Sequence, residues 1–266
     1  MTIKLVALDL DDTLLDNTQT VSPRTKKAII QAVAQGVTVT LATGRMYSSA
    51  VPYARQLGLD VPIITYNGGL IRSSLSEEIL FHQPIDSGVT SRVMALFREH
   101  GWYIQSYLED VLYVRELDEN AKLYERVSGI KAVPVGDRLY SLPGVPTKLL
   151  AMAKPEKLQQ IYEIVQDAFG GDLYITFSKP TYLEMTHPTV NKGRALEFLA
   201  ARLNIRREEV MAVGDSNNDL DMLKYAGWGV AMGNASEKVR AAAQAVTSGN
   251  DADGVAEAIE KFVLRN

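Results

Sequence analysis

The chain begins with an apolar run that leads into three carboxylates within four positions, Lys4-Leu5-Val6-Ala7-Leu8-Asp9-Leu10-Asp11-Asp12-Thr13-Leu14. A continuous apolar run predicts a β-strand buried on both faces. In open parallel sheets, ligands bind beyond the carboxyl ends of the strands, where this acidic cluster would lie. Asp9 and Asp11 are two positions apart, so an extended backbone would direct both side chains to the same face.

Two neighbouring carboxylates need a counter-charge. At a separation of about 4 Å they repel by roughly 4 kcal/mol at an effective dielectric constant near 20. A proton, a cationic side chain or a metal ion would offset this repulsion, and at this point the sequence leaves all three open.

The composition limits the class of protein. The chain has 266 residues, a formal net charge of -4 and no cysteine. This length allows two domains of about 150 residues each. Without cysteine there is no disulfide, thiol nucleophile or thiolate zinc site, which agrees with a cytoplasmic location. The mild acidity predicts no binding of nucleic acid or of an anionic membrane. We expect no signal peptide and no segment of the ~20 apolar residues that cross a bilayer.

Strands and helices alternate in the first part of the chain. Ser22 suits a helix N-cap, Pro23 the first helical position and Gly36 the position after the helix end. Further elements are expected in this order: a strand at 37–42, a helix at 47–57 that stops at Gly58, and a strand at 62–66. This alternation predicts a parallel sheet with right-handed crossovers, an α/β fold of the Rossmann-like type.

The pattern changes near Pro84 and changes back near Pro188. Between them we expect hairpins joined by helices, with a tight turn at Glu109-Asp110. The expected helices are 89–100, 118–127 and 156–169, and the expected strands are 102–108, 111–115, 147–153, 173–178 and 182–186. We therefore predict an inserted α+β cap domain at 84–187 and a core domain formed by 1–83 and 188–266.

The α/β alternation resumes with a helix that starts near Lys192. Strands are predicted at 210–213 and 229–232, and helices at 219–225 and 253–264. Asn234, with Glu237 three residues later, predicts a capping box for one more helix.

Three polar clusters follow three of the predicted strands: Asp9-Leu10-Asp11, Thr43-Gly44-Arg45 and Gly214-Asp215-Ser216-Asn217-Asn218-Asp219. In one parallel sheet they would meet at the same edge, and Lys192 could reach that edge. Carboxylate and carbonyl oxygens without histidine or cysteine favour Mg²⁺. A cation, a lysine and helix-start amides around a carboxylate are the parts that phosphoryl transfer requires.

These motifs resemble those of the haloacid dehalogenase-like (HAD) superfamily over the whole chain. Its first motif matches Asp9-x-Asp11-x-Thr13, its second Thr43, its third Lys192 and its fourth Gly214-Asp215-x-x-Asn218-Asp219. The long insert between the second and third motifs is similar to the cap of Cof-type sugar-phosphate phosphatases. One departure is Asp12, where many relatives carry glycine.

The resemblance implies a role for each acidic residue. Asp9 would be the nucleophile that forms an aspartyl-phosphate. Asp11 would protonate the leaving alcohol and then activate water. Asp9, Asp215 and the backbone carbonyl of Asp11 would bind Mg²⁺, and Asp219 would support the metal either directly or by holding one of its ligands.

The resemblance also implies a phosphate-binding and a specificity region. Thr43, the Gly44 amide and Lys192 would hold the phosphate oxygens, and Asn218 would position either the substrate or Lys192. Arg45 and Asn67 are further candidates for contact with the substrate. In the insert, the segment 179–184 is our candidate specificity surface, in which Tyr182, Glu184 and Thr186 share one strand face.

The function implied is a Mg²⁺-dependent phosphatase for small phosphomonoesters, sugar phosphates in particular. Two alternatives stay open: a phosphosugar mutase with the same nucleophile, and a non-catalytic sensor that binds a metal or a phosphosugar. The expected partner is a small phosphorylated substrate, and the expected assembly is a monomer or a small homo-oligomer.

Overall fold

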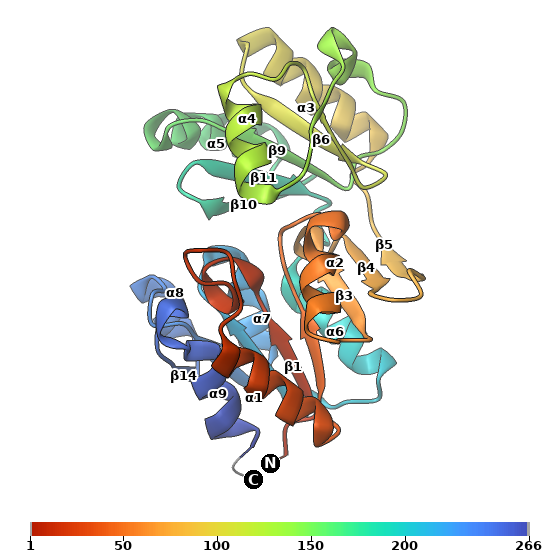
Figure 1. Ribbon diagram of the computed structural model, residues 1–266. Helices are drawn as coiled ribbons and strands as arrows, with labels where there is room; N and C mark the ends of the chain where they lie inside the picture. Colours follow the sequence, from red (N-terminus) through yellow and green to blue (C-terminus); the bar gives the residue numbers. More distant parts are fainter. Residues whose placement is uncertain (1, 265–266) are drawn as a thin grey trace.

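Three β-sheets organise residues 2–264, the part of the chain that the computed structural model describes (Figure 1). The first sheet is entirely parallel, with the strand order β14-β13-β12-β1-β2. Its strands are β1 (Leu5–Leu8), β2 (Thr38–Leu41), β12 (Val210–Gly214), β13 (Trp228–Ala231) and β14 (Ala245–Val246). The predicted α/β class with a parallel core sheet is confirmed.

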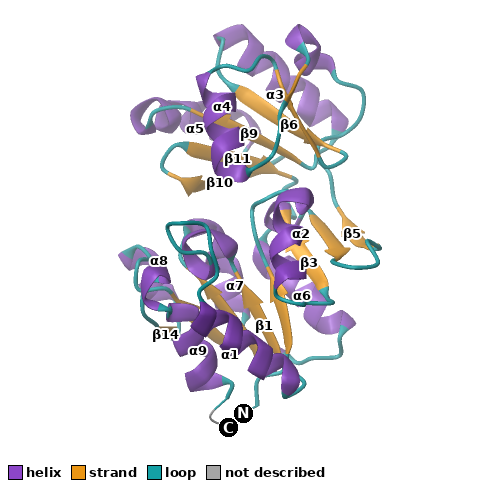
Figure 2. Cartoon of the chain, in the orientation of Figure 1, coloured by secondary structure: helices purple, strands orange, loops and turns teal. Residues whose placement is uncertain are grey.

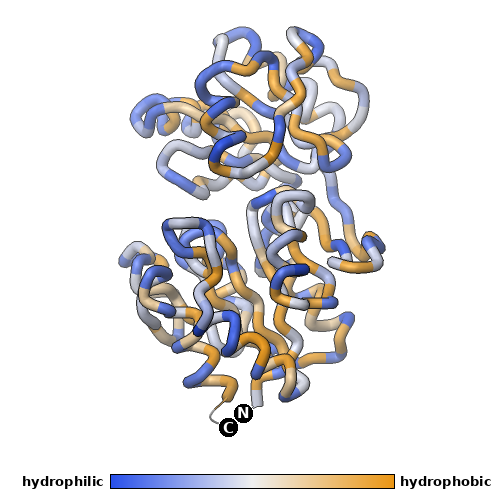
Figure 3. Tube along the Cα trace, in the orientation of Figure 1, coloured by the Kyte–Doolittle hydropathy of each residue, from blue (hydrophilic) through white to orange (hydrophobic). Residues whose placement is uncertain are grey.

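The apolar run of β1 is buried on both faces, as its sequence predicts. Val6 and Leu8 belong to one hydrophobic cluster, and Leu5 and Ala7 belong to another. One cluster includes α1 (Pro23–Ala34), α2 (Tyr47–Gln56) and α9 (Gly254–Phe262), and the other includes α6 (Lys192–Arg202), α7 (Leu220–Tyr225) and α8 (Glu237–Ala242). Figure 3 shows the strands of this sheet as mostly hydrophobic chain.

The second sheet has the order β10-β11-β9-β6-β7-β8 and is antiparallel except for the pair β7–β8. Its strands are β6 (Ile104–Leu108), β7 (Val111–Val114), β8 (Val133–Pro134), β9 (Lys148–Met152), β10 (Tyr174–Lys179) and β11 (Tyr182–Thr186). They all lie within the predicted insert. Helices α3 (Ser87–His100) and α5 (Pro155–Phe169) pack on one face. Helix α4 (Glu119–Ser128) contributes to the cluster on the other face, toward the parallel sheet (Figure 2).

The third sheet was not predicted. It is a small antiparallel sheet of β3 (Pro62–Thr65), β4 (Leu70–Ser73) and β5 (Ile79–His82). We expected β3 to extend the parallel sheet, but only one parallel bridge, between Ala42 and Ile64, links it to the end of β2. Strands β4 and β5 were missed because Leu70–Ser73 does not alternate apolar and polar residues and Ile79–His82 holds an apolar run of only three.

The helix-end predictions had mixed outcomes. Ser22 caps α1 by accepting a hydrogen bond from the Thr25 amide, and Gly36 follows the helix at φ +82°. The capping box at Asn234 is wrong, because the N-cap of α8 is Ser236. The Asn234 side chain instead donates to the carbonyl of Asp12 and accepts from the Asn250 amide. These contacts of Asn234 with residues distant in sequence replace the predicted local cap.

No helix between residues 2 and 264 combines the length and the apolar character that a membrane span requires. Location and oligomeric state stay predictions.

Candidate active site

The first acidic loop leaves β1 through a tight, irregular turn over Leu10–Leu14. The Asp9 amide donates to the carbonyl of Val213, which ties the loop to the end of β12 at 3.0 Å. Asp12 has φ +57°. This left-handed conformation costs non-glycine residues about 1–2 kcal/mol, with Asp among those that tolerate it best. The backbone geometry therefore explains why glycine suits this position and why aspartate can replace it.

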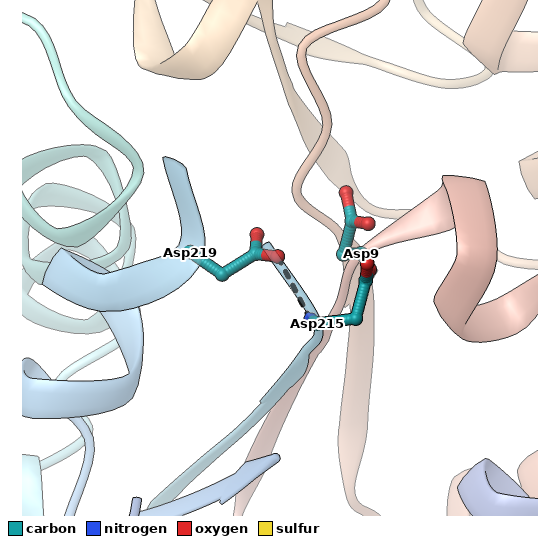
Figure 4. A group of neighbouring side chains, drawn as sticks. All are labelled: Asp9, Asp215 and Asp219. Carbon is teal, nitrogen blue, oxygen red and sulfur yellow. Dashed lines mark hydrogen bonds between the residues drawn. The ribbon is translucent and has the colours of Figure 1, made fainter. Parts of the chain in front are cut away.

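Three carboxylates meet where β1 and β12 end: Asp9, Asp215 and Asp219 (Figure 4). Each offers one oxygen, and these three oxygens lie within 4.8 Å of one another. The amides of Asp215 and Ser216 donate to Oδ2 of Asp219, both at 2.9 Å. Thr13 Oγ1 donates to Oδ1 of Asp215 at 2.8 Å. Adjacent parallel strands thus bring together carboxylates that are about 200 positions apart in sequence.

Lys192, the first residue of α6, is the cation of this cluster. Its fully buried Nζ donates to Oδ1 of Asp9 and to Oδ1 of Asp219, each at 2.6 Å. Burial lowers the pKa of Lys192, but attraction to Asp219 and Asp9 outweighs it, so the net pKa is raised. The lysine therefore stays protonated.

The pKa values of two carboxylates are raised as well, which favours their neutral forms. Burial, followed by repulsion from Asp219, raises the pKa of Asp9 well above its ordinary value. The same two causes raise the pKa of Asp215 to about 7, against the hydrogen bond from Thr13. Three ionised carboxylates and one ammonium would leave two uncompensated negative charges in a buried site, which is costly.

A divalent cation fits this charge balance and this set of donors. Oxygen ligands without histidine or cysteine select a hard cation such as Mg²⁺. The Asp11 carboxylate does not belong to the cluster found among the described residues. The metal contact expected from the sequence involves the backbone carbonyl of Asp11, and that contact stays a prediction.

The Asp11 side chain pairs with Arg45. Arg45 Nε donates to Oδ2 at 2.8 Å and Nη2 donates to Oδ1 at 2.7 Å. Burial would raise the pKa of Asp11, but the hydrogen bond and the charge of Arg45 lower it. The predicted acid–base residue and a predicted substrate contact are therefore bound to each other in this structure.

The loop after β2 holds Thr43, Gly44 and Arg45 beside the carboxylates. Thr43 Oγ1 accepts a hydrogen bond from the Arg45 amide at 3.1 Å. The Asn67 amide donates to the carbonyl of Thr43 at 3.0 Å. The structure pairs Asn218 Nδ2 with Oδ1 of Asn67 at 2.9 Å, whereas Lys192 bonds to Asp9 and Asp219. Sequence-predicted residues from four segments are thus brought into one site.

A cleft of about 600 Å³, including space open to solvent, lies between these loops and the antiparallel sheet. Its lining includes Asp9, Asp11, Thr43, Gly44, Arg45, Asp215 and Asn218. From the predicted specificity surface, Lys179, Tyr182 and Glu184 line the cleft.

The sequence analysis missed other cleft residues: Tyr124, Val127, Ser128, Lys148 and Ser178. Lys148 had a visible signal, since it is a charged residue in the strand Lys148-Leu149-Leu150-Ala151-Met152, whose other members are apolar. A buried lysine in such a strand needs a partner. The others carry no signal of their own in the sequence.

Comparison with known proteins identifies the family. A family model described as haloacid dehalogenase-like hydrolase matches residues 6–259. A Bacillus subtilis 5-amino-6-(5-phospho-D-ribitylamino)uracil phosphatase is 33% identical, with 98% of this chain and 96% of that protein covered.

Solved structures agree along nearly the whole chain. A haloacid dehalogenase-like hydrolase from Bacteroides thetaiotaomicron is 31% identical with a TM-score of 0.88, covering 98% of this chain and 99% of that one. A HAD subclass IIB sugar phosphatase is 25% identical with a TM-score of 0.85, covering 97% and 98%. This chain therefore belongs to the haloacid dehalogenase-like hydrolases, as the motifs predicted, and within them it is a phosphatase.

Proposed function

We propose that this protein hydrolyses small phosphomonoesters, sugar phosphates in particular, with Mg²⁺ and through an aspartyl-phosphate at Asp9. The observation that carries the proposal is the buried Lys192, bonded to both Asp9 and Asp219 beside the Thr43–Gly44 loop. The sugar phosphatase among the similar structures supports the substrate class.

In the first step, a carboxylate oxygen of Asp9 attacks phosphorus and the bond from phosphorus to the leaving oxygen breaks. Lys192 holds the attacking carboxylate in place through its 2.6 Å hydrogen bond. Thr43 and the Gly44 amide bind the phosphoryl oxygens. Asp11 gives its proton to the leaving alcohol, and the products of this step are the free alcohol and phospho-Asp9.

In the second step, Asp11 takes a proton from water, and the water oxygen attacks phosphorus. The bond between phosphorus and Asp9 breaks, which releases inorganic phosphate and restores the carboxylate. Asp9, Asp215, Asp219 and the carbonyl of Asp11 would hold Mg²⁺. When bound, the ion supplies positive charge that neutralises the phosphoryl oxygens and the acidic cluster.

We also propose that residues 84–187 form a cap over a core made of 1–83 and 188–266. The second sheet lies wholly inside this range and supplies Lys179, Tyr182 and Glu184 to the cleft. Such an arrangement would exclude bulk water and let the insert select the leaving group.

A phosphate-release assay tests the proposal. The substrates are p-nitrophenyl phosphate and a panel of sugar phosphates, each with Mg²⁺ and with an excess of chelator. We expect Mg²⁺-dependent release of inorganic phosphate that the chelator abolishes. Conversion of one phosphosugar into its isomer without net release would favour the mutase. Absence of turnover on the whole panel, with phosphate still bound, would favour the sensor.

A further inference from the structure

Lys148 and Glu184 form a buried ion pair at the base of the insert. They lie on neighbouring antiparallel strands, β9 and β11, in which Glu184 is opposite Leu150. Their side chains are 1% and 5% exposed, and Lys148 Nζ lies 3.4 Å from Oε1 of Glu184. A buried ion pair is weak grounds for stability, because desolvation offsets much of the attraction between the charges. A contribution to stability alone therefore does not explain why these two charges are buried together.

Both members of the pair reach across to the loops after β2 and β3. Lys148 Nζ donates to the carbonyl of Gly44 at 2.5 Å. Glu184 Oε2 accepts a hydrogen bond from Asn67 Nδ2, and Ser178 Oγ donates to Oε1 at 2.8 Å. The insert thus holds the Thr43–Gly44–Arg45 loop by its backbone and Asn67 by its side chain.

The space at Gly44 supports a close fit between the insert and this loop. A Cβ added at Gly44 would lie 3.2 Å from Glu184 Oε2 and 3.0 Å from Asn67 Oδ1. Both distances are tighter than ordinary van der Waals contacts, so a side chain here would have to displace the Glu184 carboxylate or the Asn67 amide. The close packing around Gly44 therefore belongs to the contact between the insert and the Thr43–Gly44–Arg45 loop.

Further hydrogen bonds connect this contact to the groups that are proposed to bind the phosphoryl oxygens. The carbonyl that Lys148 holds belongs to the peptide group whose N–H, that of Arg45, donates to Thr43 Oγ1. Asn67, held by Glu184, accepts a hydrogen bond from Asn218. The ion pair can thus fix the orientation of groups proposed to bind the phosphoryl oxygens.

We propose that Lys148 and Glu184 are positioning residues that lock the Thr43–Gly44–Arg45 loop and Asn67 into their phosphate-binding arrangement. The inference rests on the proposed function. It adds that the docking of the insert and the affinity for phosphate are coupled, each strengthening the other. Neither residue takes part in bond making or breaking.

The test measures phosphate affinity separately from turnover. Inorganic phosphate is titrated calorimetrically, in the presence of Mg²⁺, into the wild type, Lys148→Met, Glu184→Gln and the double variant. We expect each single variant to weaken phosphate binding by about 10-fold or more, the usual effect of losing a charge-assisted hydrogen bond. In assays with p-nitrophenyl phosphate, kcat falls together with phosphate affinity. Lys148→Arg, which keeps the charge, should restore part of the affinity.

Two comparisons keep the test specific. Ile161→Val shortens a buried side chain of α5 in the hydrophobic cluster on the far face of the sheet, and it should lower Tm without changing phosphate affinity. If a single variant fails to fold, the double variant leaves no unpaired buried charge and takes its place.

Unchanged phosphate affinity in folded variants would overturn the inference, as would a change confined to KM for one sugar phosphate. A wild type that binds phosphate without turnover would refute the proposed function, while the calorimetric comparison would still decide this inference.

Discussion

The guanidinium of Arg45 holds the Asp11 carboxylate through two hydrogen bonds, Nε to Oδ2 at 2.8 Å and Nη2 to Oδ1 at 2.7 Å. The Arg45 side chain is 8% exposed and that of Asp11 is 27% exposed. A general acid must carry a proton when the leaving group departs. As the proposed general acid, Asp11 would have to loosen this pairing during the reaction, and substrate contact with Arg45 would help to release it.

The first prediction concerns pH. In the wild type the pKa of Asp11 is lowered, so the pair stabilises the fold above the ordinary value of about 3.9 and loses this contribution as pH falls through the lowered pKa. In Arg45→Met burial still raises the pKa, opposed only by the smaller attractions of Lys179 and Lys192, so ionised Asp11 loses most of its stabilisation. We expect the Tm deficit of Arg45→Met to widen from about pH 3 to pH 6 and then level off.

Thermal melts across this pH range check the prediction. Arg55→Met is the matched control, because Arg55 pairs with Glu77 at the surface, with side chains 45% and 47% exposed. Its Tm deficit should be small, as for most exposed ion pairs. A deficit of Arg45→Met that stays constant from pH 3 to pH 6 would contradict the assigned cause.

The second prediction concerns the nucleophile. Asp9→Asn should abolish turnover, by a factor of about 10³ or more, because an amide does not form the aspartyl-phosphate. The variant should stay folded, since Lys192 keeps its bond to Asp219 and one of three repelling carboxylates is removed. Phosphate release and circular dichroism are the measurements, with Asp60→Asn, an exposed carboxylate outside the site, as the control. Substantial residual activity would reassign the nucleophile.

The third prediction concerns the metal. Saturating Mg²⁺ at about 100 times its dissociation constant should stabilise the wild type by about 2.7 kcal/mol. Asp215→Asn should show a much smaller shift, because it removes one of the three clustered carboxylates. In the presence of chelator, Asp215→Asn should melt at or above the wild-type Tm, because removing one carboxylate relieves the repulsion in the cluster. Equal Mg²⁺ shifts in the two proteins would exclude Asp215 as a ligand.

The fourth prediction concerns the turn between β6 and β7, which docks on α2. The Asp110 carboxylate accepts hydrogen bonds from the amides of Tyr47 and Ser48, both at 2.9 Å, and from the Tyr66 hydroxyl at 2.6 Å. It therefore caps a helix whose own N-cap, Met46, makes no side-chain cap. Losing such a cap costs about 1–2 kcal/mol, so Asp110→Ala should lower the free energy of unfolding by that amount.

Glu109→Ala is the matched control, because Glu109 lies in the same turn with φ +52°, beside Asp110 at +60°. Alanine bears similar backbone strain at either position, but aspartate tolerates positive φ better than glutamate does. The difference in energy therefore contains the cap and a conformational part, which hydrogen exchange separates. Urea unfolding gives the energies, and hydrogen exchange should show faster exchange of the Tyr47 and Ser48 amides only in Asp110→Ala. Equal losses in both variants would attribute the effect to the turn itself.

Much of the secondary structure and the members of the site could be predicted locally. Ser22, Pro23 and Gly36 marked the ends of α1, and the apolar run before Asp9 marked a strand buried on both faces. The acidic, Thr-Gly and lysine motifs each follow or begin an element where predicted. Local signals failed where tertiary contacts compete with them, as at Asn234, whose side chain bonds to Asp12 and Asn250 rather than capping α8.

By itself, the sequence determined most of the strands and helices and the motifs from which the site is built, because periodicity, caps and motif spacing are properties of neighbouring positions. Only the tertiary structure decided the partners: Arg45 with Asp11, Asn67 with Asn218 and Glu184, and Lys148 with Gly44. These contacts join segments 34 to 151 positions apart. Pairings at such separations depend on how the sheets and the insert pack in space, which no local pattern encodes.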